Sequence, residues 1–133
     1  GWHGYLHRFV DSDPDRGLHD HPWGRALSLV LTGGYREIRY ADTGRETTQE
    51  RRIRPGRLNR LRGEDFHRVI LEQGRPAWTL FMHGPRRKGW GFRRNGQYTE
   101  MARDAAEFRH RDWWKQAPNG RAARALRSLP ADG

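Results

Sequence analysis

The chain has 133 residues and a mass of 15.7 kDa, which fits one compact domain. No apolar run approaches the roughly 18 residues of a membrane span, and the absence of cysteine excludes a disulfide scaffold, a thiolate zinc finger and a cysteine nucleophile. The first four residues do not resemble a signal peptide, so we expect a cytoplasmic protein with no membrane association.

The charge balance is strongly basic, with 26 Lys and Arg residues against 16 Asp and Glu residues and a net charge of +10. Such a charge favours anionic partners, which include nucleic acid, phosphate and carboxylate compounds and acidic lipid surfaces. An equally simple interpretation is a solvated, arginine-rich surface. Charge therefore narrows the choice of partner without indicating the fold.

Short segments rich in β-forming residues, separated by turns of Gly, Pro and Asp, fill most of the chain. The pair Gly33-Gly34 predicts a tight hairpin between two of them. Segments of this length and spacing are typical of an all-β sandwich or barrel. The predicted strands cover residues 5–10, 26–31, 35–40, 51–54, 57–62, 66–71, 77–83 and 88–93.

The pattern changes after Tyr98. Residues 99–116 lack Gly and Pro and carry apolar residues at roughly helical spacing, with Thr99 as a plausible N-cap. A second, short basic helix is predicted over residues 121–129. We therefore divide the chain into a β-barrel domain, residues 1–97, and a basic, helical C-terminal tail, residues 98–133.

Among the seven histidines, His19 and His21 form the most informative pair. In an extended strand, residues two positions apart point to the same face, so both imidazoles can bind one metal ion while Asp20 points away. Imidazole is a common ligand of Fe, Zn, Cu and Ni. Two surface histidines beside a turn would give the same pattern.

The residues around this pair resemble the two sequence motifs of the cupin superfamily. His19 and His21 stand in the His-x-His of the first motif, and Gly33 occupies its final glycine position. Gly56 and His67 have the separation found in the second motif. The resemblance covers roughly residues 5–92 and implies a double-stranded β-helix, or jelly-roll, barrel.

Several motif positions differ from the cupin pattern. The position of the ligating Glu holds Arg25 or Ala26, which removes the fourth ligand of many cupins. The resemblance then implies a site of three histidines, His19, His21 and His67, similar to that of cupin thiol dioxygenases and diketone dioxygenases. Four other motif positions are also replaced, and they hold Asp13, Arg62, Glu64 and Leu71.

The resemblance implies a divalent metal cofactor, with Fe(II) first and Zn, Ni, Mn or Cu as alternatives. Three protein ligands leave coordination positions open for substrate or O₂. We expect a dioxygenase-type oxidation of a small anionic substrate, with Arg25 holding the anion. His83, at a predicted strand end, and His7 are candidate acid–base groups, and Trp23 either walls the substrate site or packs in the core.

Two other functions stay open at this stage. The chain could be a non-catalytic cupin that binds a small ligand or a metal, and it could form a homodimer. It could also be an arginine-rich nucleic-acid-binding module, because arginines crowd residues 51–62 and aromatic residues alternate with arginine in residues 90–94.

Overall fold

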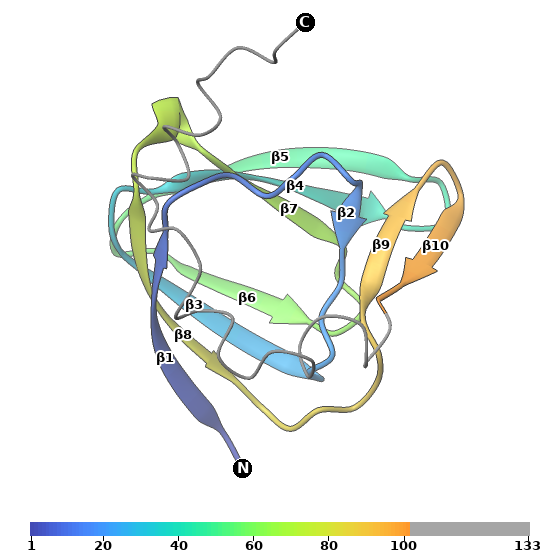
Figure 1. Cartoon of the computed structure of the whole chain (residues 1–133), viewed down its shortest axis with the longest axis horizontal. Helices are drawn as coiled ribbons and strands as arrows, with labels where there is room; N and C mark the ends of the chain where they lie inside the picture. The colour runs from blue at the N-terminus through green and yellow to red at the C-terminus, as the bar shows by residue number, and fades with distance from the viewer. Residues whose placement is uncertain (102–133) are drawn as a thin grey trace, which may run out of the picture. The chain divides into compact units, whose positions relative to one another are not determined.

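A computed structural model describes residues 1–101, and these form two antiparallel sheets that face each other across the interior (Figure 1). The all-β prediction is confirmed. The four-stranded sheet has the order β1 (His3–Phe9), β8 (Ala77–His83), β3 (Arg25–Thr32) and β6 (Leu58–Arg62). The six-stranded sheet has the order β10 (Gln97–Glu100), β9 (Gly91–Arg94), β2 (Leu18–His19), β7 (His67–Leu71), β4 (Tyr35–Asp42) and β5 (Thr47–Ile53).

A single turn of 3-10 helix, η1 (Glu72–Gly74), links β7 to β8. Within the described part of the chain, no helix is long and apolar enough to cross a membrane.

The chain crosses between the two sheets at Gly33-Gly34. The predicted hairpin at this position is wrong, because β3 pairs with β6 and β8 whereas β4 pairs with β5 and β7. Both glycines have positive φ angles, and a Cβ at Gly33 would lie 2.4 Å from the carbonyl oxygen of Pro76. The turn therefore places Val30 and Tyr35, one from each sheet, in the same core cluster.

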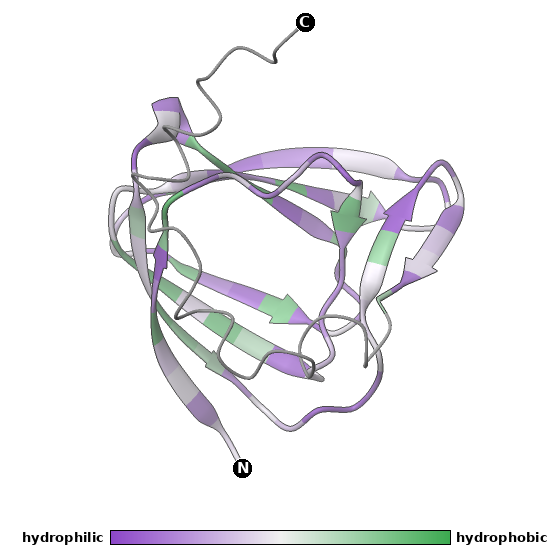
Figure 2. Cartoon of the chain, viewed as in Figure 1, coloured by the Kyte–Doolittle hydropathy of each residue, from purple (hydrophilic) through white to green (hydrophobic). Residues whose placement is uncertain are grey.

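Alternation along the strands separates the interior from the surface. On β3, the side chains of Ala26, Ser28 and Val30 are buried. Figure 2 shows apolar residues along β3 and β8 and mainly hydrophilic residues along β5, which is exposed over most of its length. Two apolar clusters result. One holds Val30, Tyr35, Ile53, Val69, Leu71 and Ala77, and the other holds Ala26, Leu61 and Phe81.

The described sheet extends past the predicted end of the barrel domain at residue 97. β10 pairs with β9 as far as Glu100, and the compact unit runs from Gly1 to Met101. Thr99, predicted as a helix cap, lies instead in β10 opposite Phe92, because the Asn95-Gly96 turn folds this segment back onto β9. The remainder of the predicted helical tail lies outside the described residues.

Candidate metal centre

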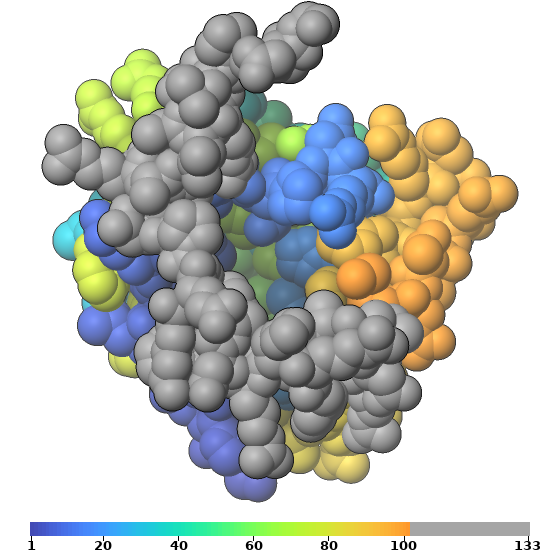
Figure 3. All heavy atoms as spheres, in the orientation of Figure 1, coloured from blue at the N-terminus to red at the C-terminus, as the bar shows by residue number. Residues whose placement is uncertain are grey.

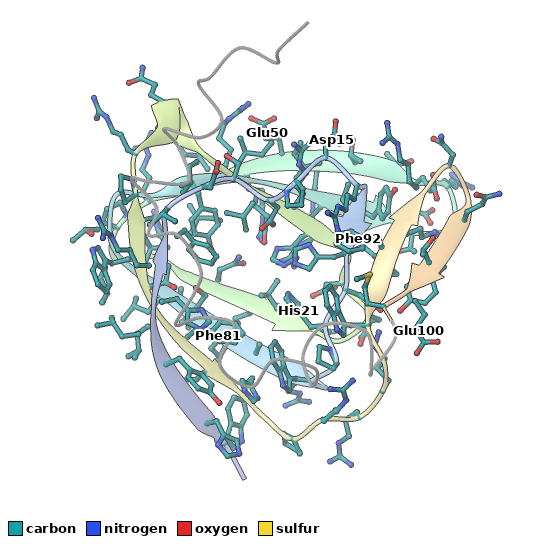
Figure 4. The ribbon with its side chains drawn as sticks, in the orientation of Figure 1. Asp15, His21, Glu50, Phe81, Phe92 and Glu100 are labelled. Carbon is teal, nitrogen blue, oxygen red and sulfur yellow. The ribbon has the colours of Figure 1, made fainter. Side chains whose placement is uncertain are left out.

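Three histidine side chains converge inside the barrel. His19 on β2 stands directly opposite His67 on β7, and His21 follows two residues after His19. One ring nitrogen from each residue lies within 4.8 Å of the others, and the Nε2 atoms of His21 and His67 are 2.8 Å apart. Figure 4 shows His21 pointing into the interior. The histidines that the cupin resemblance selected thus form one group that could hold a metal ion.

Asp20 points in the opposite direction from the histidines on either side of it. It is buried, accepts a hydrogen bond from the backbone N–H of Gly91 at 2.7 Å, and forms an ion pair with Lys88. The Tyr98 hydroxyl also donates to it at 3.4 Å. These contacts fix the β2 segment beside β9, and Figure 3 shows this segment in blue next to β9–β10 in orange.

A glycine in the β6–β7 turn permits a close approach to the segment that carries His21. A Cβ at Gly63 would lie 2.6 Å from the Trp23 carbonyl oxygen and 3.5 Å from that of His21. The Gly63 N–H also donates to the Gly24 carbonyl oxygen at 3.2 Å. The turn that leads into His67 is therefore packed against the loop that carries His21.

The carboxylate of Glu37 orients His67. Glu37 is fully buried on β4, and its Oε1 lies 2.7 Å from His67 Nδ1. A carboxylate only accepts hydrogen bonds, so Nδ1 carries the proton and donates it. The Nε2 lone pair of His67 is then directed towards the other histidines, as in the carboxylate–histidine pairs that support metal ligands.

Three donors besides His67 contact the Glu37 carboxylate. Arg51 donates to Oε2 at 2.7 Å, whereas Asn59 and Arg39 donate to Oε1 at 2.8 and 3.3 Å. Burial by itself raises the pKa of Glu37, but the hydrogen bonds from His67, Arg51 and Asn59 outweigh it and hold this pKa well below its usual value. The network therefore supplies a permanent anion behind His67.

Glu37 is not among the residues predicted from the sequence, because the cupin resemblance assigns the ligating Glu to a position before β4. One signal could have found it: Tyr35, Glu37 and Arg39 alternate along a single strand, so an inward-facing Tyr35 implies an inward-facing Glu37. Arg51, which the sequence analysis assigned to a basic run, is the residue that pairs with this carboxylate.

Burial lowers the pKa values of His19 and His21 and so favours their uncharged forms. It lowers the pKa of His19 to about 4, with a further lowering by the neighbouring His67 and a partial opposition from Asp13. The pKa of His21 is lowered well below its usual value, first by burial and then by His67 and His19. Neutral imidazoles are the form that binds metal ions, so His19 and His21 are available as ligands at neutral pH.

These pKa values predict that the metal-free protein loses stability as the pH falls from about 6.5 towards 4. The unfolded chain protonates His19 near its ordinary pKa of 6.5, whereas the folded chain does so only near 4, so protons favour unfolding in this window. The lowered pKa of Glu37 acts in the same direction below 4.5. The urea concentration at the midpoint of unfolding should therefore decrease as the pH is lowered across this range.

The control for this dependence is His19→Asn, whose urea midpoint should fall less between about pH 6.5 and 4 than that of the natural protein. The same substitution at His3, which is exposed on β1, should leave the dependence unchanged. An identical slope in the His19 variant would contradict the assigned pKa.

A cavity of about 160 Å³ opens beside the three histidines, and His7 is one of the residues that line it. The His7 ring stacks on Phe81 with centroids 5.0 Å apart, and burial followed by the charge of His83 lowers its pKa. Trp23 also lines the cavity and stacks on His21 at 5.4 Å. His7 and Trp23 therefore both line this cavity, and the acid–base role of His7 stays a prediction.

The other two predicted catalytic residues lie elsewhere. Arg25 is exposed on β3 opposite Arg62 and does not line the cavity, because its side chain alternates outwards while Ala26 points in. His83 is buried but also outside the lining. Its Nδ1 donates to the Gly84 carbonyl oxygen at 2.8 Å, and its ring stacks on Trp23 at 4.1 Å. His83 therefore supports the wall of the cavity from behind.

The aromatic residues that suggested base stacking face the histidines. The rings of Trp90 and Phe92 lie 6.4 and 5.9 Å from that of His19, in edge-on contacts. Both side chains are half-buried. Both rings therefore lie against the histidine group and do not form an outer surface with the neighbouring arginines.

The described residues form two facing antiparallel sheets, and the solved structures named below share this arrangement, which confirms the cupin fold predicted from the sequence motifs. A scan against protein-family models gives no match, and no curated protein is similar in sequence. Solved structures do match. Oxalate oxidase in complex with glycolate has a TM-score of 0.54 and 15% identity, over 69% of this chain and 46% of that chain.

Two further solved structures have the same fold. Oxalate decarboxylase matches with a TM-score of 0.52 and 15% identity, over 67% of this chain and 23% of that chain. The DMSP lyase DddQ from Ruegeria pomeroyi DSS-3 matches with a TM-score of 0.52 and 16% identity, over 68% and 42%. The chain spans less than half the length of each, and at these identities the likeness concerns the fold.

Proposed function

We propose that the protein is a metal-dependent cupin enzyme that acts on a small molecule at the His19, His21 and His67 group. The observation that carries this proposal is the convergence of three imidazoles, one buried and two half-buried, beside a cavity. A catalytic metal site requires imidazole or similar ligands and an adjacent space that a substrate can enter.

The donor set fits a divalent transition metal. Imidazole nitrogen suits Fe, Zn, Cu and Ni, and Fe(II) is our first choice because the site resembles that of the three-histidine cupin dioxygenases. When bound, the ion supplies a Lewis acid with open coordination positions. We propose dioxygenase-type oxidation as the reaction. Both oxygen atoms of O₂ then enter the product, so no external reductant is needed.

The residues around the ion have separate roles. Glu37 holds the Nδ1 proton of His67 and so keeps its Nε2 available as a ligand. His7 lines the cavity wall, and we assign it the exchange of a proton with a bound molecule. Trp23 and Phe81 exclude water from the same space. Arg25, being exposed, has no part in this arrangement.

Elemental analysis tests the metal. Protein purified without added metal, or reconstituted after chelation, should hold about one transition-metal ion per chain. The Fe(II)-loaded protein should consume O₂ with a suitable substrate, and the Zn-loaded protein, which has no redox chemistry, should not. A chain that binds no metal under either condition contradicts the proposal. Metal binding without turnover in a broad substrate screen would favour the non-catalytic alternative.

A further inference from the structure

The wall of the cavity beyond the three histidines is largely apolar. Of the nine further described residues that line it, five carry a ring, two are aliphatic, and the remaining two, Asp13 and Ser28, are polar. The lining residues are His7, Phe9, Trp23, Tyr35, Phe81, Leu61, Val69, Asp13 and Ser28.

The polar groups in this wall already have partners or carry the wrong charge for an anion. Asp13 accepts a hydrogen bond from the Val69 N–H at 2.8 Å and lies 3.8 Å from His19 Nδ1. The Tyr35 hydroxyl accepts a hydrogen bond from Asn59 at 3.4 Å. A second anionic group on a ligand would therefore meet a carboxylate in the wall rather than a cation.

Among the described residues, no arginine or lysine lines the cavity. Arg39 and Arg51 direct their guanidinium groups to Glu37, on the Nδ1 side of His67, and Lys88 is paired with Asp20. His7 adds no charge near neutral pH, since burial lowers its pKa. For the described residues, a bound metal ion would then be the one positive charge that faces a ligand in this cavity.

The volume of the cavity limits the size of the part of the ligand that lies beyond its metal-binding group. An apolar cavity of about 150 Å³ holds benzene in another protein, and the cavity here measures about 160 Å³. Aromatic walls favour a planar or ring-shaped guest through offset or edge-on contacts. A second charged group would be desolvated here without a partner, which is costly.

We propose that the ligand of this site is a compact molecule with one metal-binding group and an uncharged, apolar body of about the size of a benzene ring. The inference rests on the proposed metal function and narrows its substrate class. It removes the role of Arg25 in holding a small anionic substrate, because Arg25 is exposed and does not line the cavity.

A series of hydroxamates with one common metal-binding group tests this substrate class. Acetohydroxamate, benzohydroxamate and succinic monohydroxamate differ only in a methyl, a phenyl or a carboxyethyl body. Binding to the Zn²⁺-loaded full chain is measured by calorimetry, after zinc binding has been measured separately. We expect benzohydroxamate to bind at least about tenfold more tightly than acetohydroxamate, and the carboxylated compound to gain nothing.

Two substitutions on β6 locate the apolar body. Leu61→Phe reduces the cavity and should remove the benzohydroxamate preference while zinc and acetohydroxamate still bind. Leu58→Phe, at an exposed position on the same strand, should leave the preference intact. If Leu61→Phe does not fold, the series on the unaltered chain decides the question without it.

The outcomes separate this inference from the function on which it rests. Zinc binding with equal affinity for the phenyl and methyl compounds, or tighter binding of the carboxylated one, overturns the substrate class and leaves the metal site standing. A chain that binds no zinc overturns the proposed function, and the inference with it. A preference for benzohydroxamate that Leu61→Phe abolishes supports both.

Discussion

Replacing His67 with alanine is expected to abolish metal binding. His67 supplies one of three ligands, its Nε2 lies 2.8 Å from that of His21, and its Nδ1 connects the group to Glu37. Its loss removes a ligand and also leaves the buried Glu37 carboxylate without that donor. We expect metal affinity to fall by more than about 100-fold, which is the upper end of the effect of losing a partner behind a ligand.

His19→Ala and His21→Ala should also lose most of the metal, because each removes one of the same three ligands. His3→Ala is the matched control, since His3 is exposed and lies outside the group. Competition with a chromophoric chelator measures the affinities, and far-UV circular dichroism checks that each variant keeps its strands. Unchanged affinity in all three folded variants would show that the assigned ligand set is wrong.

Replacing Glu37 with glutamine is expected to weaken both the fold and the metal site. The amide retains one acceptor oxygen but faces either Arg51 or His67 with an N–H group. Because Arg51 is 42% exposed, the expected cost is that of an unsatisfied buried hydrogen-bonding group, about 1 to 3 kcal/mol in the free energy of unfolding. Metal affinity should fall by about 10- to 100-fold, because His67 loses the acceptor that fixes its ring.

Glu50→Gln provides a matched control for this change. Glu50 lies on β5, and it pairs with Arg36 at 3.1 Å with both side chains well exposed. The same chemical change there should cost less than about 1 kcal/mol and leave metal affinity unaltered. Urea unfolding and chelator competition on the two variants measure both quantities. A folded Glu37→Gln protein with natural metal affinity would refute the orienting role.

A measurement on the unaltered, metal-free chain keeps this prediction testable even if Glu37→Gln does not fold. Nitrogen-15 NMR distinguishes the two tautomers of a neutral imidazole. His67 should carry its proton on Nδ1, since that atom donates to Glu37 at 2.7 Å. A proton found on Nε2 would mean that Glu37 does not set the direction of the lone pair.

Local patterns determined much of this protein. The strand over residues 77–83 is predicted with the bounds that the structure shows, because β-forming residues there are bounded by Pro76 and Gly84. The spacing of His19 and His21 placed both imidazoles on one side of an extended segment, with Asp20 on the other. These features depend on the alternation of side chains along an extended backbone, which is determined by residues close together in the sequence.

Only the tertiary structure decided how these segments meet. In the fold, Gly33-Gly34 connects one sheet to the other, and Arg25 lies on the outside. Glu37 contacts His67, although the two residues are 30 positions apart in sequence. The physical reason is that a strand pattern fixes which residues share a face but not which strand lies next to it. Pairing follows from burying Val30 and Tyr35 in one core and satisfying a buried carboxylate, both of which depend on the whole fold.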